Sequence, residues 1–254
     1  MRSKDYFFAG TSGLVLPVPN KAAFPEEYRN GSRLTYYSSL FNSIEINSSF
    51  YKIPLQKTLE RWTTETPAHF RFTLKLWRGI THERDLLFDQ TAVAAFMEAA
   101  AGIGRKKGCL LVQLPPTAKL DKTLQLQTLL TRLRVHDPGR TWRIAVEFRH
   151  PSWYVNKTSE LLRQHGASIV LQDMQASSSW SEPGEGNFVY LRYHGPAGDY
   201  KGGYADARLA TDAAGIRRWL SAKKTVYAYF NNTIGDALID LQRLRESVLL
   251  PVSQ

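Results

Sequence analysis

The chain has 254 residues, of which 43% are hydrophobic and 22% are charged, and its formal net charge is +10. This composition supports a sizeable core and excludes a disordered or fibrous protein, while no apolar run reaches the roughly 18 residues that a membrane span needs. The single cysteine, Cys109, excludes an internal disulfide, and residues 1–9 lack the long apolar stretch of a signal peptide, so a cytoplasmic protein is expected.

Short β-rich runs alternate with longer helical patterns along the chain, which is typical of βα units around a parallel sheet. Strands are predicted at residues 6–10, 43–47, 71–77, 109–114, 143–149, 168–173, 188–194 and 225–231. Helices are predicted near residues 32–41, 55–65, 90–103, 121–133, 157–165, 206–221 and 235–248. Eight strands, each followed by a helix, predict a single α/β domain over residues 1–254 with the (β/α)8 TIM-barrel fold. A doubly wound open sheet is the alternative, but the first strand is not followed by a G-x-G-x-x-G turn.

The connections that follow the strands are longer than those that precede them. The joints at residues 13–30, 78–89, 174–185 and 195–205 are long, whereas the helix-to-strand joints at residues 41–42 and 166–167 are brief. Barrels carry their sites on the loops at the C-terminal ends of the strands, so this asymmetry points to function at that face.

Several strands alternate between apolar and polar residues, although the strands of a buried parallel sheet are usually apolar throughout. In the second strand Ile44 and Ile46 share one face and Glu45 lies on the other, and the fifth strand sets Val146 against Glu147. Because amphipathic helices need an apolar surface to cover, we expect the polar face to point into the barrel. The polar side chains near the strand ends are then expected to line one cavity: Glu45, Asn47, Lys75, Gln113, Glu147, Arg149, Asp173, Arg192, His194 and Asn231.

Such a concentration of ionised groups favours a functional site, because an ion removed from water costs several kcal/mol unless partners compensate it. We predict that Glu45 and Glu147 form an acid/base pair whose environments separate their pKa values, with His194 as a proton-transfer partner. The alternative is that each glutamate only neutralises a neighbouring cation. Arg149 and Arg192 suit the bidentate recognition of a phosphate or carboxylate, so an anionic or sugar-like small-molecule ligand is predicted.

The ligand is expected to contact the other polar residues of this cavity and two loop residues, Tyr51 and His82. A glycine-rich loop at residues 194–204 follows the seventh strand, where barrels often hold phosphate. The full set of predicted ligand-binding residues is Asn47, Tyr51, Lys75, His82, Gln113, Arg149, Asp173, Arg192 and Asn231.

A divalent metal is an alternative occupant of the same cavity. Oxygen and imidazole ligands are offered by Glu45, Glu147, Asp173, His82 and His194. However, Lys75, Arg149 and Arg192 would repel a cation, and neither an H-E-x-x-H motif nor a Cys/His pattern occurs. We therefore predict no metal and no cofactor.

The basic character of the chain raises a nucleic-acid partner as the second functional hypothesis. Phosphate backbones attract dense patches of Lys and Arg. Here the basic residues are scattered, and their densest cluster is only residues 105–107. The sequence thus favours an enzyme, a hydrolase or an isomerase, over a nucleic-acid-binding or phosphodiester-processing protein, and it does not indicate an oligomeric state.

Short motifs distributed in order along the chain resemble the YecE-like family, a domain of unknown function. They are G-T-S-G at residues 10–13, I-E-I-N-S-S-F-Y at 44–51, F-R-F-T-L-K at 70–75, I-T-H at 80–82, Q-L-P-P at 113–116, E-F-R-H-P-S-W at 147–153, R-Y-H-G-P at 192–196 and Y-A-Y-F-N-N at 227–232. The resemblance implies a TIM barrel with a polar mouth and no established activity.

Two positions depart from the usual pattern of this family. The family continues G-T-S-G with an aromatic residue, where this chain has Leu14, and it commonly has Asp where this chain has Thr233. The resemblance therefore implies neither an aromatic platform in the first loop nor an acidic group after the eighth strand of this chain.

Overall fold

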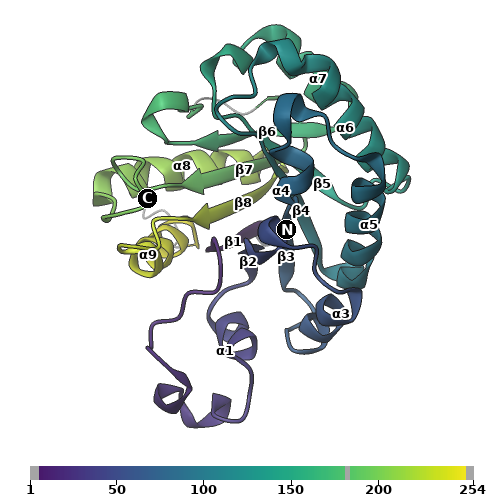
Figure 1. The fold of residues 1–254 in the computed structure, drawn as a ribbon. Helices are drawn as coiled ribbons and strands as arrows, with labels where there is room; N and C mark the ends of the chain where they lie inside the picture. Colours follow the sequence, from purple (N-terminus) through teal and green to yellow (C-terminus); the bar gives the residue numbers. More distant parts are fainter. Residues whose placement is uncertain (1–5, 181–183, 250–254) are drawn as a thin grey trace.

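Eight parallel strands curve into a nearly closed barrel with helices packed around its outside (Figure 1). The computed structural model describes residues 6–180 and 184–249, so most of the charged start of the chain lies outside the described residues. The strands are β1 (Phe7–Thr11), β2 (Ser43–Ile46), β3 (Arg71–Lys75), β4 (Lys107–Gln113), β5 (Arg143–Glu147), β6 (Ala167–Gln172), β7 (Phe188–Tyr193) and β8 (Thr225–Phe230). The predicted TIM-barrel fold and its eight strands are confirmed.

The helices lie close to the predicted ranges. They are α1 (Arg33–Leu40), α2 (Ser48–Tyr51), α3 (Gln56–Thr64), α4 (Arg78–Thr81), α5 (Gln90–Ala100), α6 (Thr123–Val135), α7 (Asn156–Gln164), α8 (Asp206–Ser221) and α9 (Ala237–Leu249). Local chemistry explains their limits: Ser32 accepts a hydrogen bond from the amide of Thr35 at the start of α1, and Asp89 does the same for Thr91 at α5. No helix in the described part of the chain is long and apolar enough to cross a membrane.

Two details of the predicted alternation are wrong. The described residues between β6 and β7 contain a single short 3-10 turn, Gln175–Ser177, and no α-helix, so not every strand is followed by a helix. Conversely, the one-turn helices α2 and α4 were not predicted. They are too short to show an apolar periodicity, and both lie in the loops directly after β2 and β3.

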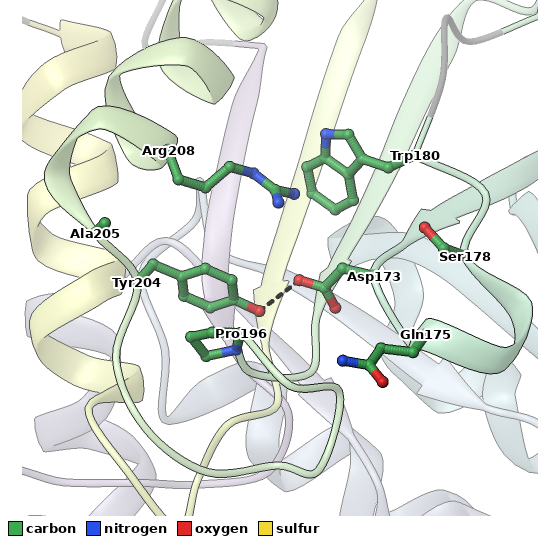
Figure 2. A pocket seen from close by; sticks show the side chains of 8 residues that line it. All are labelled: Asp173, Gln175, Ser178, Trp180, Pro196, Tyr204, Ala205 and Arg208. Atoms are coloured by element: carbon green, nitrogen blue, oxygen red, sulfur yellow. Dashed lines mark hydrogen bonds between the residues drawn. The ribbon is translucent and has the colours of Figure 1, made fainter.

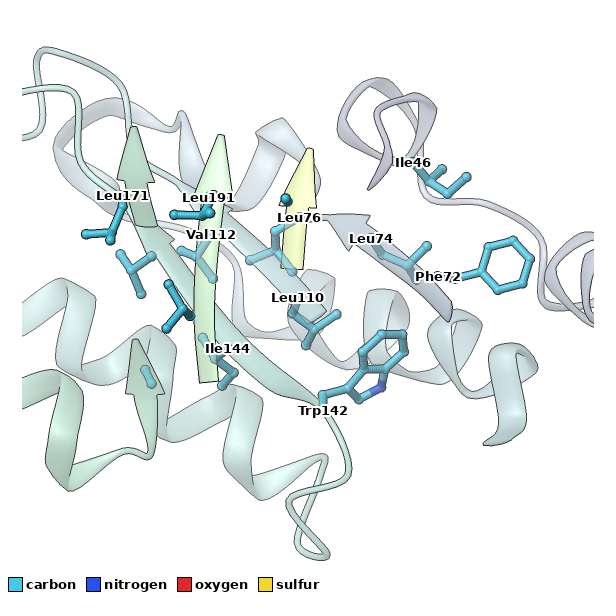
Figure 3. Close-up of a cluster of buried hydrophobic side chains, with 14 of the residues drawn as sticks. Ile46, Phe72, Leu74, Leu76, Leu110, Val112, Trp142, Ile144, Leu171 and Leu191 are labelled. Atoms are coloured by element: carbon cyan, nitrogen blue, oxygen red, sulfur yellow. The ribbon is translucent and has the colours of Figure 1, made fainter. Parts of the chain in front are cut away.

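The alternation within the strands separates two hydrophobic cores. The larger core lies between the strands and the helices and includes Ile44, Phe72 and Val146, whose side chains point outward as predicted (Figure 3 shows part of this layer). The smaller core fills the inside of the barrel and consists of Phe8, Cys109, Leu111, Ala145, Val170, Phe188, Tyr190, Tyr227 and Tyr229. Aromatic rings therefore close the barrel below the polar mouth.

The seam between β1 and β2 is held largely by side chains, because these two strands do not form a regular ladder. The hydroxyl of Tyr37 accepts from the amide of Thr11 at 2.7 Å and donates to the carbonyl of Ser43 at 3.1 Å. The carboxamide of Asn42 accepts from the amide of Ala9 at 2.9 Å and donates to a carbonyl of β1 at 2.8 Å. Both side chains thus substitute for backbone hydrogen bonds that would otherwise close the barrel.

Removing the Tyr37 hydroxyl is expected to weaken this seam. The substitution Tyr37→Phe leaves the Thr11 amide and the Ser43 carbonyl without this buried partner, which costs about 1–3 kcal/mol of the free energy of unfolding. Urea denaturation measures the loss. Tyr51→Phe is the matched control, since Tyr51 is 69% exposed, and it should leave the midpoint unchanged. Equal midpoints for Tyr37→Phe and the wild type would contradict this account of the seam.

Candidate active site

The mouth of the barrel is organised around a buried guanidinium. Arg192, on the inward face of β7, is 1% exposed and reaches across the barrel axis. Its Nη2 and Nε donate to the two carboxylate oxygens of Glu45 at 2.7 and 3.0 Å, and its Nη1 donates to Oε2 of Glu147 at 2.6 Å. Arg192 therefore bridges two carboxylates that come from β2 and β5.

A second guanidinium completes the pairing of these charges. Arg149 follows β5, and its Nε pairs with the other oxygen of Glu147, Oε1. The carboxamide oxygen of Gln113 accepts from Arg149 and from Arg192, at 3.3 Å each. Two carboxylates and two guanidiniums thus form a balanced group, which we call the charge quartet (Glu45, Glu147, Arg149 and Arg192).

Both glutamates of the charge quartet are ionised in this arrangement. Burial by itself would raise the pKa of each carboxyl group. Arg192 beside Glu45, and Arg149 together with Arg192 beside Glu147, outweigh that effect and hold both pKa values below their usual range. The hydroxyls of Ser12 and Tyr190 also donate to Glu45, the latter at 2.5 Å. Neither carboxylate is exposed to solvent.

His194 lies beside the charge quartet as a neutral ring. Its Nε2 is 3.1 Å from Nη2 of Arg149 and 3.1 Å from Nη1 of Arg192, and because guanidiniums only donate, Nε2 must accept. We therefore assign the ring proton to Nδ1, which is 3.4 Å from Oδ1 of Asp173. Burial lowers the pKa of His194 more than Asp173 and Glu147 raise it.

Above the charge quartet lies a cavity of about 210 Å³ that opens at the mouth. It is lined by Asn47, Phe50, Tyr51, Lys75, Gln113, Arg192, Tyr200 and Asn231. We call it the mouth cavity. Lys75, the last residue of β3, places its ammonium 4.0 Å from the centroid of the Phe50 ring. Among the described residues, no carboxylate lies within ion-pair distance of this ammonium.

The structure brings most of the predicted site residues together. Six of them line the mouth cavity: Asn47, Tyr51, Lys75, Gln113, Arg192 and Asn231. Glu45, Glu147, Arg149 and His194 are in contact with Arg192 or with each other beneath it. His82 is not among the residues that line the mouth cavity, but its ring lies 4.9 Å from that of Phe50, which does. Burial and then Lys75 lower the pKa of His82 to about 4.

Asp173 is the predicted residue that faces elsewhere. It follows the end of β6, where Gln172 is the last inward residue, and it lines a second cavity of about 440 Å³ (Figure 2). There it accepts from the hydroxyl of Tyr204 at 2.5 Å, while its other oxygen accepts from the amide of His194 at 2.8 Å. Two other residues that line this cavity are in contact, because the guanidinium of Arg208 lies over the ring of Trp180 at 4.4 Å from its centroid. Asp173 therefore holds His194 in place through its backbone amide and lies next to its ring nitrogen Nδ1.

Sequence reasoning missed four residues of the site. Ser12 and Tyr190 bind Glu45, and Phe50 and Tyr200 line the mouth cavity. The alternation along β7 was enough to place Tyr190, because it shares the inward face with Arg192. Phe50 and Tyr200 lie in loops, where no periodicity indicates the direction of a side chain.

A divalent metal was the predicted alternative occupant of the mouth, and the described residues do not form a group of ligands for it. Across residues 6–180 and 184–249, no three His, Cys, Asp or Glu side chains are grouped as metal ligands. Glu45 and Glu147, which that alternative requires, are directed at guanidiniums instead.

A parallel barrel with a charged site at the C-terminal ends of its strands defines the class of protein as a TIM-barrel protein with a polar mouth. The family described as "Protein of unknown function DUF72" matches residues 8–253, and the chain belongs to this family. The resemblance to YecE-like proteins that the sequence motifs indicated is thereby confirmed.

Two curated relatives and one family structure are similar to this chain, and their names state no activity. The chain is 31% identical over 137 residues to the UPF0759 protein YunF of Bacillus subtilis and 28% identical over 145 residues to the UPF0759 protein YecE of Escherichia coli. These matches cover 52% and 55% of this chain and 47% and 52% of the relatives, so the chain spans about half the length of the curated relatives it matches. A crystal structure of a DUF72 family protein from Enterococcus faecalis superposes with a TM-score of 0.80 at 19% identity, covering 97% of each chain, and shows the same fold.

Removing the central guanidinium is expected to destabilise the protein in a pH-dependent way. Arg192→Met leaves both glutamates buried with too little positive charge, which costs about 3–5 kcal/mol at neutral pH. In the wild type the lowered pKa values stabilise the fold above the unfolded carboxyl pKa of about 4.3, and this stabilisation is lost as the pH falls below it. In the variant the pKa values rise, so its stability should increase as the pH is lowered from about 8 to 5.

Denaturation at several pH values measures this difference. The triple variant Arg192→Met, Glu45→Gln and Glu147→Gln is the control, because it removes the unpaired carboxylates and should lose that pH dependence. A single variant Arg192→Met whose stability runs parallel to that of the wild type from pH 8 to 5 would be inconsistent with two ionised glutamates held by Arg192.

Proposed function

We propose that this protein is an enzyme that binds a small, polar, anionic ligand in the mouth cavity, with Lys75 as the group that recognises its negative charge. The observation that carries the proposal is the charge balance of the mouth. The two carboxylates and two guanidiniums of the charge quartet neutralise each other, whereas Lys75 faces the cavity with no ion pair in the described structure. A ligand anion would supply the missing partner of this half-buried ammonium.

The amide groups of the mouth cavity support a ligand that also makes hydrogen bonds. The Asn47 carboxamide donates to Ser12 at 2.8 Å, and its buried oxygen Oδ1 has no hydrogen-bond partner. The oxygen of Gln113 is held by two guanidiniums, which turns its Nε2–H donors toward other partners. A ligand hydroxyl that donates to Asn47, and a ligand oxygen that accepts from Gln113, would satisfy both side chains.

The predicted acid/base pair stays a prediction, and the geometry favours another role for it. Glu45 and Glu147 are unexposed, and each accepts at least two hydrogen bonds or ion pairs from arginines or hydroxyls. Such carboxylates position Arg192 and fix the charge of the site, whereas a general base must reach the proton that it removes.

Loss of the Lys75 ammonium is expected to abolish anion recognition. Lys75→Met should weaken the binding of inorganic phosphate at least about tenfold, because a hydrogen bond to a charged group contributes about 1.5–3 kcal/mol. Lys75→Arg should retain much of it. Isothermal titration calorimetry measures both affinities. The control is Lys223→Met, an exposed lysine between α8 and β8. Equal phosphate affinity in the wild type and Lys75→Met would remove the basis of the proposal.

The second hypothesis, a nucleic-acid ligand, predicts a different response to salt. Affinity for a nucleic acid falls by about one logarithmic unit per tenfold rise in salt for every phosphate contacted. A site with one unpaired lysine should therefore show a slope of at most about one with a nucleic acid, and little binding of single- or double-stranded DNA at low salt. A steep slope with DNA that persists in Lys75→Met would favour the basic surface, with its net charge of +10, as the binding region.

A further inference from the structure

Lys75 has the surroundings of a nucleophilic amine. Its backbone ends β3, its stem lies inside the barrel mouth, and its Nζ is held over the ring of Phe50, an apolar surface that offers no hydrogen-bond acceptor atom. The described structure gives this Nζ neither a hydrogen bond nor a carboxylate partner, unlike Lys106, whose Nζ donates to carbonyls of residues 63 and 66 at 2.6 and 2.5 Å. Lys75 is therefore presented to the mouth cavity rather than tied to the fold.

Burial, together with the neighbouring Arg192, disfavours the protonated form of Lys75. Arg192 from β7 and Arg149 after β5 are nearby cations, while Glu45 from β2 and Glu147 from β5 are turned toward those guanidiniums. His82, after α4, is neutral at physiological pH. Burial, and then Arg192, lower the pKa of Lys75 to about 8 in spite of the two glutamates. An amine with this pKa has roughly two hundredfold more of its unprotonated form at neutral pH than an ordinary lysine.

We propose that Lys75 is a catalytic nucleophile that forms an imine with a small carbonyl compound carrying a carboxylate, such as a 2-oxo acid. The inference rests on the proposed anion-binding function, since the carboxylate brings the carbonyl carbon to the amine. Buried lysines placed next to another cation are the form of this residue that suits Schiff-base chemistry. The cavity of about 210 Å³ admits a compound of this size.

The covalent step needs no partner other than the two reactants. The Lys75 ammonium that pairs with the carboxylate first releases one proton to solvent. The unprotonated Nζ then attacks the carbonyl carbon, and a C–N bond forms to give a carbinolamine. The C–O bond then breaks, and the carbonyl oxygen leaves as water with the two protons that were on nitrogen, which leaves a C=N bond. When this imine takes up a proton it carries the same positive charge as the ammonium, so its attraction for a neighbouring carboxylate is preserved.

The mouth cavity supplies the contacts that such an adduct requires. The Nε2–H donors of Gln113 and the carboxamide of Asn231 line the cavity, and they are suited to carboxylate oxygens. The buried Oδ1 of Asn47 can accept from the hydroxyl of the carbinolamine. The charge quartet below is balanced, so it adds little net charge that would repel an anionic reactant.

Reductive trapping tests the proposal directly. The full chain is incubated with pyruvate and sodium cyanoborohydride at pH 7.5, and the labelled lysines are identified by peptide mass spectrometry. We expect Lys75 to be modified at least about tenfold faster than exposed lysines such as Lys223, with a rate that saturates in pyruvate. A parallel reaction with formaldehyde, which carries no charge, reports the reactivity of the amine alone, and Lys75 should again react first.

Variants separate this inference from the proposed function. Lys75→Arg keeps the positive charge but cannot form an imine, so it should still bind phosphate and should lose only the preferential label. Phosphate binding without faster labelling of Lys75 by pyruvate would overturn the imine and leave the anion site standing. Fast labelling of Lys75 by formaldehyde but not by pyruvate would show that the reactant is not a carbonyl compound that carries a carboxylate. Labelling by pyruvate without any phosphate binding would refute the proposed anion anchor while retaining the nucleophile.

Discussion

The pairing of Arg192 with two carboxylates is the interaction on which the arrangement of the mouth depends. Arg192 comes from β7, Glu45 from β2 and Glu147 from β5, so a single guanidinium fixes three strands across the barrel axis. Such a group is stable only because every charge has a partner, since an unpaired ion at this depth would cost several kcal/mol. The same pairing leaves the Lys75 ammonium without an ion pair among the residues that the structure describes. The chemistry we propose follows from this difference between paired and unpaired charges.

Much of this site follows from the two-residue period of a strand. Glu45, Glu147 and Arg192 could be placed on the inward face because their neighbours Ile46, Val146 and Leu191 must meet the helices, and the structure confirms that division. Parallel strands then gather their C-terminal ends at one rim. The fold and most of the charged side chains gathered at the mouth were therefore accessible from the order of polar and apolar residues.

The roles within the site were not accessible in the same way. Which carboxylate meets which cation depends on side-chain directions across the barrel, and the strand period says nothing about them. Asp173 was expected in the mouth, but β6 ends one residue earlier, and the side chain turns to the second cavity and to Tyr204. Phe50, whose ring lies under the ammonium of Lys75, belongs to the one-turn helix α2, which is too short to show an apolar periodicity in the sequence. Loops and pairings thus account for what the sequence did not predict.

Glu45 joins the closure of the barrel to the electrostatics of its mouth. Its backbone carbonyl accepts from the amide of Gly13 at 2.8 Å, just above the seam that Tyr37 spans, while its carboxylate holds Arg192. A substitution that loosens β1 against β2 therefore also displaces Arg192, which lines the mouth cavity, even when the substituted residue contacts neither Glu45 nor Arg192. The residues that close the barrel between β1 and β2 and the residues that set the charge of the mouth are therefore linked through Glu45. A change in one of these two properties consequently changes the other.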